Sequence, residues 1–210
     1  MLKKNKGLIL SVSIVLLLLG ISSQLVFSKD KKIVSNNGVS LDDAVTKVLK
    51  EMPEIKINKT QTLNDVNLVS VEETLDSKKA EFRLKVQNET TDLNHNNEYL
   101  EKSAVADTER YLKAIQIAKE VYGVSITQEE VNNYIDENIA SVVTPEKEEY
   151  AKALGLTLYE LDYIFDRDFY VMDTLWDKLI PVLMEQHPQK DGEDDNQYLE
   201  RIRKEFHSKL

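Results

Sequence analysis

Helix start and stop signals recur along the second half of this chain, and they limit its fold more than any other feature. Apolar residues at helical spacing predict a long helix over 98–122, which Gly123 is placed to end as a C-cap. Threonine-to-glutamate capping boxes at 127–130 and 157–160 predict the starts of two more helices. We therefore expect residues 98–210 to form a module of helices.

Prolines and an acidic break divide the rest of this module. Pro145 is placed to begin a short helix that Gly155 ends. A long helix is expected over 158–180, with Pro181 bending or ending it. A last amphipathic helix is expected after the acidic run 191–195.

The residues before position 98 show a different pattern. A polar tether at 29–39 leads into a short amphipathic helix, after which apolar and charged residues alternate. Alternation with a period of two predicts strands with one buried face. The three candidate strands are 55–57, 66–71 and 80–86. We interpret 40–90 as a small helix-plus-antiparallel-strand unit, so the expected fold class is α+β, mainly α.

The first 28 residues have the composition of an export segment. Three lysines and no acid accompany an apolar stretch over 7–27. In one interpretation this is a signal peptide cleaved after Ser28. In the other, its 21 residues cross about 30 Å of hydrocarbon as an uncleaved anchor, with the basic start held in the cytoplasm. Both place the rest of the chain outside the cytoplasm, as a single-pass protein of the cell membrane or as a secreted one.

Charge and residue content exclude several classes of function. The net charge of −10 repels nucleic-acid phosphate, so we expect no nucleic-acid partner. The absence of cysteine rules out disulfides and thiolate metal sites. We find no phosphate-binding loop, zinc motif or nucleophile signature, and His95, His187 and His207 are scattered. We therefore expect no catalytic residue, no cofactor and no metal.

The acids of the expected helix 158–180 fall into two groups on a helical wheel. Asp162, Asp166, Asp173 and Asp177 share one side, which we interpret as a solvated face rather than a cation site. Asp168 falls among the apolar positions instead. We therefore expect Asp168 to meet an arginine or lysine from a neighbouring helix.

Two runs resemble a known family. The run 111–131 reads YLKAIQIAKEVYGVSITQEEV, and the run 153–160 reads ALGLTLYE. With the helices around them, over 98–186, they resemble the N-terminal helical module of SurA- and PrsA-type extracytoplasmic chaperones. In that family a parvulin-type prolyl isomerase domain often follows; about 24 residues come after Gln186 here, so we expect no such domain. The resemblance thus implies the helical module without the isomerase.

The resemblance implies a non-catalytic, chaperone-like protein that binds unfolded or extended polypeptide. Aromatic residues are the candidate peptide contacts: Tyr159, Tyr163, Phe169, Tyr170 and Trp176. Tyr163 and Tyr170 fall off the apolar stripe of the wheel, so we expect them to be exposed. Phe165 and Trp176 fall on that stripe and are expected in the core. The alternative is a structural or regulatory adaptor that docks one folded extracytoplasmic partner.

Overall fold

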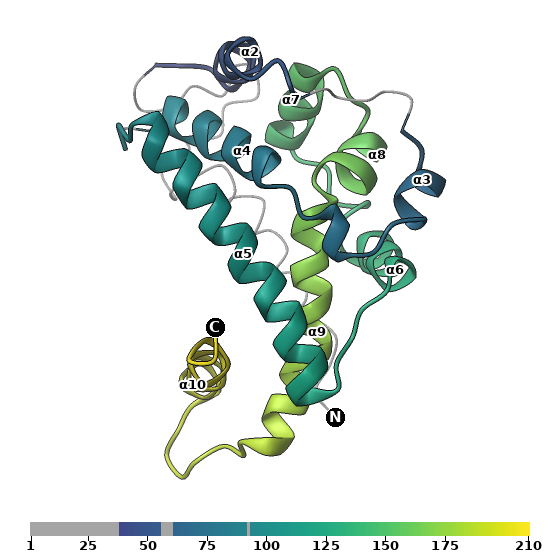
Figure 1. The fold of residues 1–210 in the computed structure, drawn as a ribbon, viewed down its shortest axis with the longest axis vertical. Helices are drawn as coiled ribbons and strands as arrows, with labels where there is room; N and C mark the ends of the chain where they lie inside the picture. Colours follow the sequence, from purple (N-terminus) through teal and green to yellow (C-terminus); the bar gives the residue numbers. More distant parts are fainter. Residues whose placement is uncertain (1–37, 56–60, 92) are drawn as a thin grey trace.

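The protein is helical throughout the part of the chain that its computed structural model describes, residues 38–55, 61–91 and 93–210 (Figure 1). These ranges contain nine α-helices, a short 3-10 turn and a π-helical turn, and no β-strand. None of the helices in these ranges has the length and apolar content needed to cross a bilayer. The export segment expected at 1–28 lies outside the described residues, as does most of the tether.

The elements follow one another along the chain with short connections. In order, they are α2 (Leu41–Glu51), α3 (Leu63–Asn67), η1 (Glu72–Thr74), α4 (Ser77–Thr90), α5 (Asn97–Tyr122), α6 (Gln128–Asn138), α7 (Pro145–Leu154), α8 (Leu158–Glu160), the π-turn η2 (Leu161–Phe165), α9 (Arg167–Gln186) and α10 (Asp195–His207). Helices α5 and α9 are the two long elements. After α9 the chain turns back, and α10 lies near the C-terminal ends of both long helices (Figure 1).

The α+β expectation is wrong for the described part of the chain, because the strands expected at 66–71 and 80–86 are not formed. Residues 80–86 lie inside α4, where Phe82 and Val86 are buried one turn apart. Glu81 and Arg83 are buried as well, because both have ion-pair partners. A helix that is buried on several sides has no clear division into a polar and an apolar face. Over a stretch as short as 80–86, apolar and charged residues can then alternate as they do in a strand.

The other two candidate strands have different outcomes. Residues 66–71 comprise the end of α3 and the turn that leads to η1. The candidate at 55–57 lies mostly outside the described residues.

The helix boundaries expected from capping signals are confirmed. Gly123 and Gly155 end α5 and α7 in the left-handed conformation, with φ of 66° and 70°. Thr127 and Thr157 begin α6 and α8, and each forms a complete capping box with the glutamate three residues later. These contacts span a single turn, which is why sequence alone is enough to place them.

The long helix expected over 158–180 is interrupted and then extended. The π-turn η2 widens the backbone at Leu161–Phe165, and Asp166 leaves helical geometry before α9 begins. Helix α9 then passes through Pro181 and ends only at Gln186. An internal proline costs about 3 kcal/mol. Burial of Leu179 and Leu183 on either side offsets this cost.

Two apolar clusters hold the helices together. The larger joins α5, α6, α9 and α10, and the smaller joins α2, α4 and α7 with η2. Helix α4 also packs along α5. Each of the two clusters therefore contains residues from both segments, 40–90 and 98–210.

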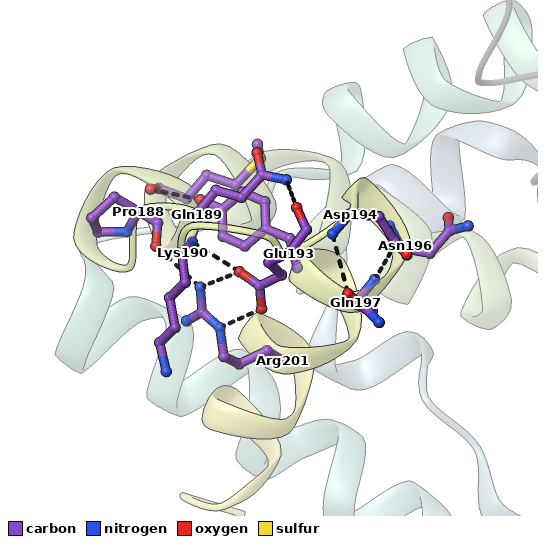
Figure 2. Close-up of polar contacts among 10 residues, drawn as sticks. Pro188, Gln189, Lys190, Glu193, Asp194, Asn196, Gln197 and Arg201 are labelled. Atoms are coloured by element: carbon purple, nitrogen blue, oxygen red, sulfur yellow. Dashed lines mark hydrogen bonds and ion pairs between the residues drawn. The ribbon is translucent and has the colours of Figure 1, made fainter.

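Helix α10 is attached at both its apolar face and its first turn. Tyr198, Ile202 and Phe206 are buried against the larger cluster. From within α10, Arg201 donates to both carboxylate oxygens of Glu193 in the preceding turn, at 2.8 and 3.0 Å, and to the carbonyl of Pro188 (Figure 2). This fork-shaped pair lowers the pKa of Glu193 to about 2.

Candidate functional site

A cleft opens where α4, α5 and the start of α9 meet, and we call it the α4–α5 cleft. Its volume is about 190 Å³. Its apolar wall consists of side chains that are all only partly buried: Leu75, Ala80, Leu84, Tyr111 and Phe169. Its polar lining includes Asp76, Arg83, Asp107 and Asp168. The cleft therefore combines accessible apolar surface with charge.

An ion pair forms the inner wall of the cleft. Arg83 donates to both carboxylate oxygens of Asp168 in a fork, one of them at 3.1 Å, and to Asp166 at 3.3 Å. All three side chains are buried. The arginine partner expected for Asp168 is thus confirmed, and it comes from α4.

The same arginine positions the aromatic ring of the cleft. The Arg83 guanidinium lies 3.9 Å from the centre of the Phe169 ring, within the range of a cation–π contact. One face of the Phe169 ring is therefore covered by the guanidinium, and the ring cannot turn away without losing this contact. This arrangement keeps Phe169 in a fixed position on the cleft wall.

Burial and charge shift the pKa values of this cluster in opposite directions. Burial raises the pKa of Asp166 to about 7, with Arg83 opposing the shift and the neighbouring charge of Asp168 adding to it. Burial lowers the pKa of Arg83, but the charges of Asp168 and Asp166 outweigh burial and hold it above its ordinary value. The arginine is therefore permanently charged.

A second buried pair lies behind the cleft. Lys147 donates to Asp162 at 2.7 Å and to the carbonyls of Ile139 and Val142 at 3.2 and 3.1 Å. All three of its N–H groups are thereby used. Burial raises the pKa of Asp162, with Lys147 opposing the shift. An inner cavity of about 40 Å³ separates this pair from the Arg83 cluster, which leaves room for a few water molecules.

The solvated acidic face expected on the helix 158–180 is not formed. Asp162 and Asp166 are buried in ion pairs, and Asp173 is partly buried. Only Asp177 is exposed. The helical wheel assumed a rotation of 100° per residue throughout. The π-turn and the break at residue 166 change this angle, so side chains before α9 point in other directions than a regular helix predicts.

The expected peptide-contact residues also lie elsewhere than the wheel predicts. Tyr163 and Tyr170 are only 7% and 3% exposed, so the expectation of exposed rings is wrong for both. Tyr163 donates to Asp136, and Tyr170 to Asp162 at 3.5 Å. Tyr159 is half-exposed and stacks on Tyr163.

Phe169 is the one expected contact residue that lines the α4–α5 cleft. The core positions expected for the other two aromatic residues agree with the structure, because Phe165 is buried and Trp176 packs against the larger cluster.

A further buried cation, Arg167, has no carboxylate partner among the residues that the structure describes. It is 1% exposed and donates to the Gln128 side chain and carbonyl, each at 2.8 Å, and to the Asn132 side chain at 2.7 Å. Burial lowers its pKa to about 10. Because these bonds join the start of α9 to α6, Arg167 has a structural role.

Sequence reasoning missed most of the cleft. Arg83 and Leu84 were hidden by the assignment of 80–86 to a strand, although Phe82 and Val86 at a spacing of four already indicated a helix. Tyr111 was read only as part of a helix. No local signal relates residue 111 to residue 84, since they lie on different helices.

The site has no arrangement of groups that suggests catalysis. His95 and His207 pack on the aromatic rings of Tyr99 and Trp176, and neither lines the cleft. Within the described ranges, no cluster of three or more acidic or histidine side chains is placed to hold a metal ion. Comparison of the chain with protein-family models, curated proteins and solved structures finds no match.

Proposed function

We propose that this chain is an extracytoplasmic, chaperone-like protein that binds extended or unfolded polypeptide without catalysis. In this proposal residues 1–28 deliver it to the membrane, where it stays anchored or from which it is released by cleavage. The proposal draws on the resemblance of residues 98–186 to the helical module of SurA- and PrsA-type chaperones.

The observation that carries the proposal is the α4–α5 cleft. Pockets that enclose a drug-sized molecule usually have about 300–1,000 Å³, and this cleft is smaller. Its volume suits one or two side chains, which is what an extended polypeptide presents. Its accessible apolar wall gives such side chains a site to bury against.

Suppression of aggregation tests this function directly. The full chain, kept in mild detergent, is added to a secreted protein whose disulfides have just been reduced, and light scattering is followed. We expect the scattering to fall as the chain reaches equimolar amounts. Unchanged scattering at several-fold excess would contradict the proposal.

A second candidate is an adaptor that docks one folded partner. The observation in its favour is the burial of Tyr163 and Tyr170, which leaves less exposed aromatic surface than a broad peptide-binding groove requires. Crosslinking in cells distinguishes the two candidates. A chaperone is expected to capture many unfolded chains, whereas an adaptor captures a single folded species.

A further inference from the structure

We infer that the α4–α5 cleft selects extended segments in which an apolar side chain stands two residues from a lysine or arginine. This inference rests on the proposed function and names the class of segment that the cleft accepts. It depends on an apolar wall, a rim on which acids outnumber cations and the geometry of an extended chain.

The apolar wall supplies the first half of the selectivity. Leu84 is partly exposed and belongs to neither of the two apolar clusters, although it projects from the middle of α4. Tyr111 faces it from α5, and Phe169 is held from behind by Arg83. An aliphatic or aromatic side chain placed between them removes apolar surface from water on both partners.

The rim supplies the second half, because its acids outnumber its cations. Three carboxylates line the cleft, against the single guanidinium of Arg83, which is already bonded to Asp168 and Asp166. Asp76 lies on the α4 side of the cleft and Asp107 on the α5 side.

The basic residues near the rim are already engaged. Arg110 pairs with Asp107 in a solvent-exposed contact, which is a weak interaction. Lys78 pairs with Glu81 and Glu101, and Lys79 donates to the carbonyl of Ile164. The cleft lining itself has three carboxylates against one guanidinium, so an arriving cation is attracted more than an arriving carboxylate.

The spacing follows from the conformation of an extended peptide. Side chains at positions i and i+2 lie on the same face, about 7 Å apart along the chain. When the first enters the apolar wall, the second reaches the rim. Lysine and arginine also place their apolar stems along such a wall while the charge stays at its edge.

Peptide binding to the full chain tests the inference. Fluorescein-labelled peptides with Gly/Ser flanks carry the core Phe-Ser-Lys, Phe-Ser-Ser, Phe-Ser-Glu or Ser-Ser-Lys, and fluorescence anisotropy gives Kd. We expect Phe-Ser-Lys to bind most tightly and Phe-Ser-Glu roughly tenfold more weakly at low salt. The difference should shrink at high salt, because rim charges are screened.

Variants locate the preference in the cleft. Asp76→Asn combined with Asp107→Asn should remove the Lys-over-Glu preference and keep the preference for Phe. Asparagine still caps a helix, so α4 is retained. Leu84→Ser should weaken all peptides that contain Phe. The control is Glu98→Gln, which removes an exposed, ion-paired acid of α5 and should leave the preference unchanged. Far-UV circular dichroism confirms that each variant is folded.

The outcomes separate the inference from the proposed function. Binding of Phe peptides without a Lys preference, or a preference that survives the double variant, overturns the inference and leaves the chaperone function standing. No peptide binding together with no suppression of aggregation overturns both.

Discussion

Replacing Arg83 by methionine tests how far the cleft wall depends on its ion pair. Methionine keeps an unbranched apolar stem and removes the charge, so Asp168 and Asp166 remain buried without a cation. Removing one partner of a buried ion pair costs about 3–5 kcal/mol. For a protein of this size that corresponds to a fall in Tm of roughly 6–20 °C. This loss is a large part of a typical stability of about 5–15 kcal/mol.

The pH dependence of Arg83→Met has a definite sign. Burial already raises the folded-state pKa of Asp166 to about 7 although Arg83 opposes the shift, so removal of the guanidinium raises this pKa further. A carboxyl group of this kind favours the folded state while it is protonated, and that contribution is lost as pH rises through the folded-state pKa. The variant should therefore lose most stability at about pH 8 and least at about pH 4.

Thermal unfolding followed by circular dichroism at several pH values measures this effect. The matched control is Arg110→Met, since Arg110 pairs with Asp107 in an exposed contact and should change Tm by no more than about 2 °C. Adding Asp166→Asn and Asp168→Asn to Arg83→Met should recover much of the loss, because no buried charge remains. The reasoning is refuted if Arg83→Met and Arg110→Met have equal effects, or if the loss is the same at pH 4 and pH 8.

Three more changes have defined outcomes. Burial raises the pKa of Asp173 to about 7, and one of its oxygens is buried without a hydrogen bond. Asp173→Asn should therefore raise the free energy of unfolding by roughly 2 kcal/mol above pH 7 and have no such effect near pH 4. Urea unfolding at the two pH values measures this difference. Lys147→Met leaves Asp162 buried without its cation and should lower the free energy of unfolding by about 3–5 kcal/mol in the same assay. A smaller loss at pH 8 than at pH 4 would contradict this account. Phe206→Ala should cost about 3–5 kcal/mol and alter the fluorescence of Trp176, the only tryptophan, because the two rings are 5.2 Å apart.

The buried ion pairs are in contact with the aromatic wall of the cleft. Arg83 covers one face of the Phe169 ring, and its buried guanidinium is bonded to Asp168 and Asp166. The apolar wall and the buried charges are thus one structural unit. Variants intended to test binding should therefore change Leu84 or the rim acids, and leave this unit intact.

Local signals in the sequence determined where most helices of the second half begin and end. The left-handed glycines at 123 and 155 and the capping boxes at 127–130 and 157–160 depend on atoms within one turn. The same reasoning predicted a cationic partner for Asp168, because a charged residue among apolar positions must be neutralised. It did not identify that partner.

The tertiary structure decided the rest, since it depends on contacts between distant residues. Helix α4 resembles a strand in sequence because Glu81 and Arg83 are buried by partners, one of them 85 residues away. The π-turn at Leu161–Phe165 rotated the aspartates and tyrosines before α9 out of the phase that a regular helix predicts. A periodic pattern reports which faces are apolar only while the helix is regular and its polar residues face water. Where ion pairs replace water, only the packed structure shows which side chains reach the surface.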